Sequence, residues 1–184
     1  EYGLTWTSLD APLVEIGALT DEIPRRGERR IWLQELAPST RLFSYVMNNY
    51  WHTNYKADQE GPVTLRYVLA PHRGSDTAAA KRLGLEAASP LIPVVAGRDS
   101  PVPRFPLAVR SPGFVATRLK PSLDGKAWVL RLFNASSMPE KLLLSGEALD
   151  QERVFLSDLS ETQGPPLSVP LEAPAFGILT LLIR

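Results

Sequence analysis

Cysteine is absent from this chain of 184 residues, so neither a disulfide framework nor a thiolate metal site can form. Excess charge of either sign is absent as well, because 20 Lys and Arg balance 20 Asp and Glu. This balance argues against nucleic acid or an anionic membrane as the main partner. No apolar run reaches the roughly 18 residues that a membrane-spanning helix requires, so we expect no membrane span.

Motifs for metal binding and catalysis are also missing. The only histidines, His52 and His72, are too far apart in sequence for His-x-His or His-Glu-x-x-His spacing. No Gly-x-Ser-x-Gly nucleophile motif occurs, and no spacing brings two of the available carboxylates together for glycoside hydrolysis. We therefore expect this chain to contain no catalytic residue, no metal ligand and no cofactor.

What the sequence does contain is a series of short strand patterns separated by turn residues. Spacing of this kind indicates an antiparallel β-sandwich, and we predict an all-β fold. Both alternating faces of the last segment, 176–183, are apolar, which is typical of a strand buried on both sides. The predicted strands are 2–8, 10–17, 31–36, 43–55, 63–69, 114–119, 127–134, 140–145, 153–159, 167–171 and 176–183.

Two other segments interrupt the strands. Ser75 can cap a short helix over 76–85, the only good helix in the sequence. Between 87 and 113 there are six prolines, too many for a helix or a central strand. We interpret this segment as an extended crossing that packs along the surface between two β units. The predicted organisation is 1–95 as the C-terminal part of a larger sandwich, 96–113 as the crossing and 114–184 as a small terminal sandwich.

The most informative segment is 43–55, a strand-like run with three asparagines beside Tyr50 and Trp51. Amides hydrogen-bond hydroxyl groups, while indole and phenol rings offer flat apolar surfaces to sugar rings. The candidate contact residues for a sugar are Asn48, Asn49, Trp51 and Asn54. Two alternatives stay open. The asparagines could satisfy backbone groups at a bulge or at a domain contact, and Trp51 could lie on the buried face of its strand.

Several segments, in order along the chain, resemble glycoside hydrolase family 38, the zinc-dependent α-mannosidases. The most specific is the Asn-Tyr-Trp-x-Thr-Asn pattern within 43–55. The others are Ser8-Leu-Asp-Ala-Pro-Leu-Val-Glu-Ile-Gly17, Gly61-Pro-Val-Thr-Leu-Arg-Tyr67, 127–136, 154–159 and 176–182. They are similar to the β-sandwich region that follows the catalytic domain in this family.

The resemblance implies a non-catalytic sandwich that packs on its own N-terminal catalytic domain and helps to shape a site for a mannose-containing glycan. It places the zinc and the aspartate nucleophile in that preceding domain, which this sequence does not include. A strand-like pattern directly after Glu1, without an initiator methionine, likewise predicts a fragment of a longer protein. Without a visible N-terminus, we assign a cytoplasmic location only as an expectation.

Two alternatives to this function remain open from the sequence. One is a free-standing carbohydrate-binding module, and the other is a purely structural interaction sandwich. If a covering domain is removed, we also expect a homo-oligomer formed through the first third, with Trp6, Trp32 or Tyr50 near the contact.

Overall fold

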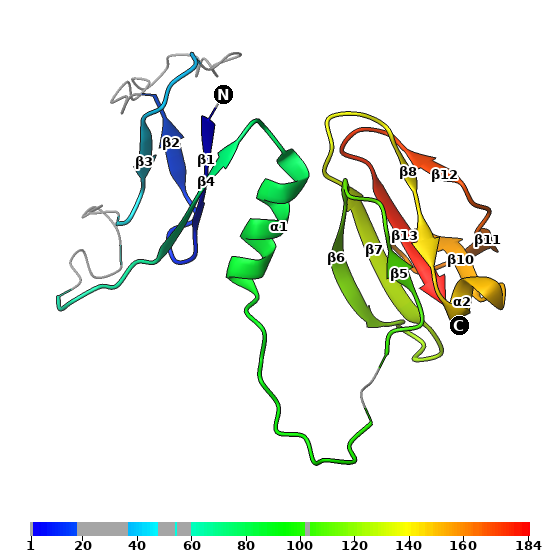
Figure 1. Ribbon diagram of the computed structural model, residues 1–184. Coiled ribbons are helices and arrows are strands. Elements are labelled where there is room, and N and C mark those ends of the chain that lie inside the picture. The colour runs from blue at the N-terminus through cyan, green and yellow to red at the C-terminus, as the bar shows by residue number, and fades with distance from the viewer. Residues whose placement is uncertain (1, 18–36, 48–53, 55–59, 102–103) are drawn as a thin grey trace. The chain divides into compact units, whose positions relative to one another are not determined.

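The computed structural model describes residues 2–17, 37–47, 54, 60–101 and 104–184 (Figure 1). Contacts divide the chain into two units, one of residues 4–71 and one of residues 1–3 with 72–184. Strands predominate in both units, and the strand pairs described in the second unit are all antiparallel. The predicted all-β class is therefore confirmed.

A five-stranded sheet forms one layer of the second unit, in the order β11-β10-β13-β7-β6. Strands β6 and β7 form a hairpin around the turn Ser122-Leu-Asp124-Gly125, in which Gly125 adopts φ 69°. The five strands are β6 (Phe114–Pro121), β7 (Trp128–Asn134), β10 (Val154–Ser157), β11 (Gln163–Pro166) and β13 (Ile178–Ile183). The C-terminal half of β13 is buried on both faces, as its apolar pattern predicted.

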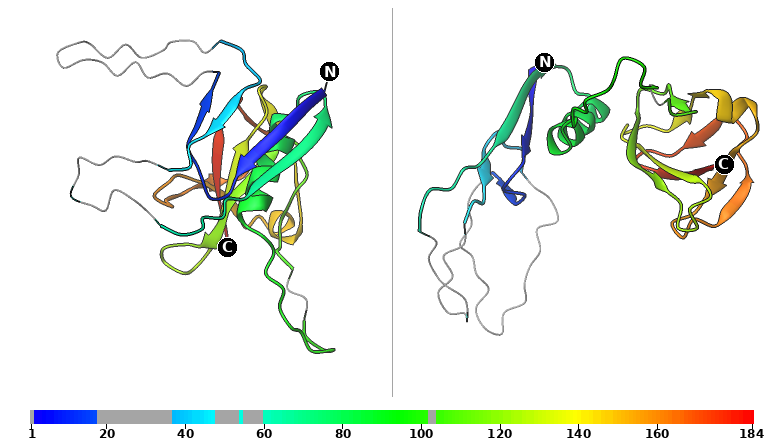
Figure 2. Two further views of the ribbon diagram at one scale, coloured as in Figure 1. Left: turned by 90° about the vertical axis from the view of Figure 1, so that its left-hand side faces the viewer. Right: turned by 90° about the horizontal axis from the view of Figure 1, so that it is seen from below.

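The second layer consists of two short strand pairs, β12-β8 and β5-β9 (Figure 2). Their strands are β5 (Ala108–Val109), β8 (Glu140–Leu142), β9 (Leu144–Ser145) and β12 (Leu171–Ala173). Leu142 and Ala173 pack from this layer against Leu132 and Leu181 of the five-stranded sheet, and all four are fully buried. A core between two antiparallel layers is the defining feature of a sandwich.

Helix α1 (Thr77–Ala88) covers part of the outer face of β6. Ala78 and Leu85 of the helix contact Val115 and Phe133, which point away from the main core. Asp76 caps the helix, because its Oδ1 accepts a hydrogen bond from the N–H of Ala79 at 2.8 Å. The helix was predicted, but one residue earlier, with Ser75 as its cap.

The first unit contains two antiparallel ribbons, β1-β4 and β2-β3. Their strands are β1 (Tyr2–Ser8), β2 (Val14–Ile16), β3 (Leu42–Ser44) and β4 (Tyr67–Arg73), and the boundary between the units crosses the first ribbon. Trp6 stacks on Tyr67 with ring centroids 5.5 Å apart. Arg66, immediately before β4, forms a bidentate pair with Asp10, with side-chain distances of 3.0 and 2.8 Å.

Several predicted element boundaries are wrong. Of the strand expected over 43–55, residues 43–44 lie in β3 and Tyr45–Met47 are not in a strand, while 48–53 and 55 lie outside the described residues. Its expected hairpin partner instead begins at Tyr67 and pairs with β1, where the Trp6 stack and the Asp10 pair fix the register. Of the strand expected over 167–171, only Leu171 lies in a strand, β12, because residues 167–170 connect β11 to β12. Helix α2 (Glu147–Asp150) was not predicted, and the strand expected over 31–36 lies outside the described residues.

Candidate functional site

Of the four residues predicted to contact sugar, only Asn54 is described. It lies at an exposed bend, and its side chain makes no hydrogen bond to another described residue. Asn48, Asn49 and Trp51 lie outside the described residues, as do Trp32 and Tyr50. Their proposed roles stay predictions.

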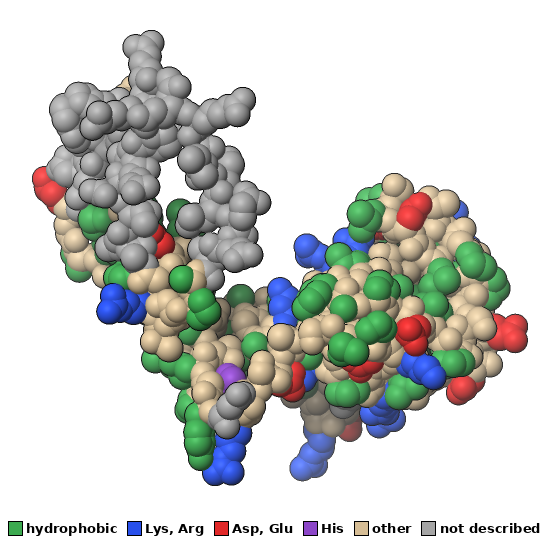
Figure 3. Space-filling model, turned by 90° about the horizontal axis from the view of Figure 1, so that it is seen from above, with side chains coloured by type: hydrophobic (Ala, Val, Ile, Leu, Met, Phe, Trp, Pro, Cys, Tyr) green, Lys and Arg blue, Asp and Glu red, His purple; other side chains and the backbone are tan. Residues whose placement is uncertain are grey.

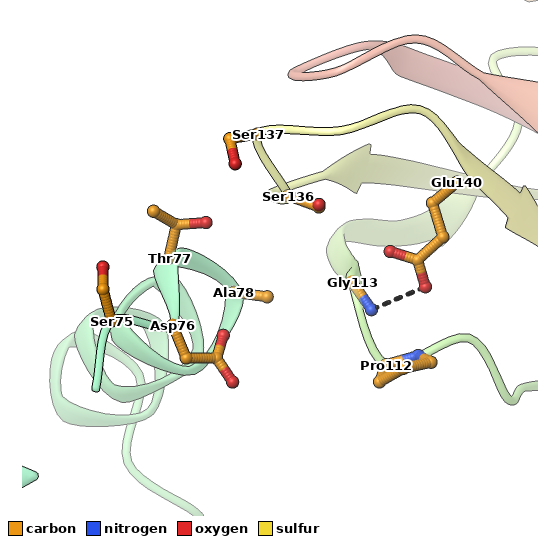
Figure 4. Close-up of a pocket in the computed structure, with 9 residues that line it drawn as sticks. All are labelled: Ser75, Asp76, Thr77, Ala78, Pro112, Gly113, Ser136, Ser137 and Glu140. Carbon is orange, nitrogen blue, oxygen red and sulfur yellow. Dashed lines mark hydrogen bonds between the residues drawn. The ribbon is translucent and has the colours of Figure 1, made fainter. Parts of the chain in front are cut away.

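The second unit contains a polar hollow of about 310 Å³ between the start of α1 and the sandwich (Figure 4). Three short segments and one side chain form its wall, and most of them carry a hydroxyl or a carboxylate. The lining residues are Ser75, Asp76, Thr77, Ala78, Pro112, Gly113, Ser136, Ser137 and Glu140. All belong to one unit, so the hollow is a property of the terminal sandwich and its helix.

One wall is the first turn of α1, held to the sandwich by a direct hydrogen bond. The Thr77 hydroxyl donates to the carbonyl oxygen of Ala135 at 2.6 Å. Ala78, 5% exposed, packs on Ala135 and Val115 below it. The helix start is therefore positioned both by a polar tie and by apolar burial.

The opposite wall depends on the close approach of Glu140 to Gly113. Glu140 Oε1 accepts a hydrogen bond from the Gly113 N–H at 2.9 Å, drawn as a dashed line in Figure 4. A Cβ added at residue 113 would lie 1.6 Å from Glu140 Oε2, so only glycine allows this approach. The glycine thus sets the position of the carboxylate at the rim of the hollow.

The loop at the upper rim is held by the fully buried side chain of Asn134. Its Nδ2 donates to the carbonyl oxygens of Met138, Ala173 and Pro174, at 3.0, 3.3 and 2.9 Å. Its Oδ1 accepts from the N–H of Ser136 at 3.0 Å. Because every polar atom of this amide is paired, Asn134 is a structural residue rather than a ligand-binding one.

The hollow presents polar groups that make no hydrogen bond to another described residue. Within the described part of the chain, no hydrogen bond of the Ser75 or Ser137 hydroxyl is recorded. One oxygen of Asp76 caps α1 and one oxygen of Glu140 binds Gly113, so each carboxylate retains a second oxygen. Hydroxyls and carboxylate oxygens can hydrogen-bond a polyhydroxylated ligand, which is the chemistry that this arrangement allows.

The described ranges contain no group of three or more His, Asp or Glu side chains that could hold a metal ion. His72 lies beside Gly3, and its Nδ1 is 2.9 Å from the carbonyl oxygen of Gly74. In the same described ranges, no helix is both long and apolar enough to cross a membrane.

A second small hollow, of about 180 Å³, lies beside the β6–β7 turn. Glu161, whose side chain is only 7% exposed, forms an ion pair with Lys120 and accepts a hydrogen bond from the N–H of Leu123 at 2.6 Å. The Lys120 hydrogen bond, followed by that backbone N–H, holds the pKa of Glu161 below its ordinary value. This carboxylate fastens the loop 158–162 onto the sheet.

The fold of the second unit defines a class, an antiparallel β-sandwich domain, with a polar hollow beside its helix. Residues 113–181 match the model of the glycosyl hydrolases family 38 C-terminal beta sandwich domain. The terminal sandwich is therefore similar to that domain, and the match supports, over these residues, the resemblance seen in the sequence. No curated protein and no solved structure matches the chain.

The polar hollow was not predicted from the sequence. Its walls come from positions 75–78, 112–113 and 136–140, and their proximity depends on how α1 packs on β6. One local signal was available in the sequence for the helix start. Asp76 lies three residues before Ala79, the spacing at which an N-cap side chain accepts a hydrogen bond from a backbone N–H of the first helical turn.

Proposed function

We propose that this chain is the non-catalytic C-terminal β-sandwich portion of an α-mannosidase-type glycoside hydrolase. It packs on the zinc-dependent catalytic domain of that enzyme and helps to shape its site for a mannose-containing glycan. The observation that carries the proposal is the family 38 match over the terminal sandwich. The family resemblance assigns the zinc to that catalytic domain.

Within this proposal, the asparagine-rich segment contributes to the sugar site from the first unit. Its amides and its indole have the chemistry to bind sugar hydroxyls and a sugar face. Trp51→Ala or Asn54→Ala in the intact enzyme should raise KM or lower kcat for an α-mannoside by about tenfold, as loss of one or two hydrogen bonds or a stacking contact would.

The control variant is Asn134→Asp, which alters a buried structural amide. This variant should lower the melting temperature of the enzyme, so its effect should not be confined to KM. If Trp51→Ala and Asn54→Ala leave both the kinetics and the stability of the intact enzyme unchanged, the segment does not reach the sugar.

A second candidate function is a carbohydrate-binding module that binds sugar without any other domain. The polar hollow favours it, because the Ser75 and Ser137 hydroxyls and two carboxylate oxygens are open to a polyhydroxylated ligand. The two functions differ in a measurable way: a module binds sugar alone, whereas an accessory domain needs the catalytic domain.

A further inference from the structure

The register of β6 and β7 places two arginines directly opposite each other. Arg118 of β6 pairs with Arg131 of β7 in the antiparallel ladder. Side chains of directly opposite residues lie on the same face of a sheet, with Cβ atoms about 4.5–5.5 Å apart. Here it is the outer face, because Leu130 and Leu132, on either side of Arg131, belong to the main core. Two like charges in this arrangement repel each other.

A β-bulge in β6 creates this pairing. The register shifts between Ala116 and Arg118, and the hydroxyl of the extra residue, Thr117, donates to the Arg131 carbonyl oxygen at 3.2 Å. Ala116 lies opposite Leu132, so in a regular ladder Thr117 would lie opposite Arg131. Arg118 would then point toward the core face. Because bulges often re-aim a side chain next to a functional site, this bulge is a first sign that the arginine pair has a role.

The arginine pair is not neutralised by a carboxylate of the described residues. In the described part of the second unit, the ion pair formed is Lys120–Glu161, and Arg118 and Arg131 form none. Both oxygens of Glu161 are already engaged, one by Lys120 and the other by the N–H of Leu123. The Lys120 hydrogen bond lowers the pKa of Glu161 most and the charge of Arg131 lowers it least. Glu161 is therefore the partner of Lys120, and the two arginines keep their charge.

The surroundings of the arginine pair add no further negative charge. On one side, helix α1 packs on Phe133, which follows Arg131 on the same face of β7. The acidic residue of α1, Glu86, is exposed and forms no ion pair with a described residue. Figure 3 shows that basic and acidic side chains are otherwise interspersed over the face of the sandwich unit in that view. Two adjacent arginines without an acidic partner depart from that pattern.

The two guanidinium groups differ in how firmly they are held. Arg131 is half-buried, and its Nε donates to the hydroxyl of Thr180 on β13 at 3.4 Å. Thr180 is only 6% exposed and lies directly opposite Arg131 in the ladder. Arg118 is exposed and makes no hydrogen bond to a described residue, so all its N–H donors are free. One positioned fork and one adaptable fork thus point away from the same face.

The ligand that fits two adjacent guanidinium groups is an anion with more than two oxygens. A single arginine fork already pairs both oxygens of a carboxylate. A phosphate or sulfate group has further oxygens for the second fork, and its charge offsets the repulsion between the arginines. We propose that Arg118 and Arg131 form a binding site for a phosphate or sulfate group, either free or carried by a sugar. The site does not depend on the proposed function.

The test measures binding of inorganic phosphate and of sulfate to the 184-residue chain by isothermal titration calorimetry at constant ionic strength. The variants are Arg118→Gln and Arg131→Gln. The control is Arg110→Gln, which removes the same charge at another exposed arginine of the same unit. We expect each site variant to bind at least tenfold more weakly than the native chain, and the control to bind as the native chain does. Arg118→Gln is the decisive variant, because Arg131 also ties β7 to β13.

The melting temperature gives a second readout. An anion that binds only the folded chain raises the melting temperature, so phosphate should raise it for the native chain and not for Arg118→Gln. In chloride buffer without phosphate, Arg118→Gln should melt no lower than the native chain, because the substitution removes a repulsion. A clearly lower melting temperature of Arg118→Gln in chloride would contradict the arrangement from which the site is inferred.

Glucose 6-phosphate, with glucose as its control, identifies the source of the anionic group. Binding tighter than that of inorganic phosphate assigns the site to a phosphorylated sugar, and equal or weaker binding assigns it to the free anion. If the native chain binds neither phosphate nor sulfate, the inference is overturned. It is also overturned if Arg110→Gln weakens binding as much as Arg118→Gln does, because binding would then follow net charge alone. Neither result changes the proposed function, which the experiments with α-mannosides test.

Discussion

At the scale of single residues, the polar hollow depends on a glycine and an asparagine that do not themselves present groups to a ligand. Gly113 allows the Glu140 carboxylate to reach the backbone, and Asn134 holds the loop that carries Ser136 and Ser137. Substitutions of Gly113 or Asn134 should therefore alter the shape and the stability of the hollow rather than the chemical groups that it presents to a ligand.

Gly113→Ala tests this dependence. The added Cβ would overlap Glu140 Oε2, so Glu140 must move and its hydrogen bond to the backbone is lost. We expect the free energy of unfolding in urea to fall by about 1–3 kcal/mol. In a Glu140→Ala background the same glycine substitution should be much less destabilising, because the overlap is gone. Equal effects in both backgrounds would contradict the role assigned to this contact.

At the scale of elements, the loop 158–162 is fastened to the β6–β7 hairpin by Glu161. The carboxylate pairs with Lys120 and accepts from the Leu123 N–H, and both interactions favour its ionised form. A carboxyl group whose pKa is lowered on folding adds stability above its unfolded pKa. That stability is lost as the pH falls through the folded value.

Glu161→Gln should therefore be less stable than the native chain at pH 7, and the difference should shrink as the pH falls below about 4. Thermal unfolding followed by circular dichroism between pH 7 and pH 3 measures it. Asp124 and Asp158, whose pKa values hydrogen bonds also lower, remain in both proteins and cancel in the comparison. A difference in stability that does not change with pH would contradict the ion-pair interpretation.

The elements that the sequence predicted well are those whose signals are local. The β6–β7 hairpin follows from its apolar strands and its Asp-Gly turn, and β13 follows from a run that is apolar on both faces. Strand pairing in the first unit was predicted incorrectly, because the Arg66–Asp10 pair and the Trp6–Tyr67 stack join residues about 60 positions apart. Helix α2 is too short to show periodicity.

At the scale of the whole molecule, the similarity to family 38 was predictable because strand patterns of that family recur in order, and the family model matches the terminal sandwich. The polar hollow was not predictable, since it joins segments from α1, β6 and the β7–β8 loop. The exposure of the aliphatic side chains at 91–95 was not predictable either, because a proline-rich segment gives no sign of whether these side chains are covered. The domain boundaries proposed from composition, 1–95, 96–113 and 114–184, and the homo-oligomer expected through the first third stay predictions.

The central claim is that this chain contributes to a sugar site only together with the catalytic domain. Calorimetric titration with mannose and α-linked manno-oligosaccharides, of the chain alone and of the intact enzyme, tests it most directly. We predict binding by the intact enzyme and no measurable heat for the chain alone. A dissociation constant tighter than about 1 mM for the chain alone, or about −4 kcal/mol, would contradict the claim. If Ser75→Ala combined with Ser137→Ala weakened that binding, the polar hollow would be the sugar site of a self-sufficient binding module.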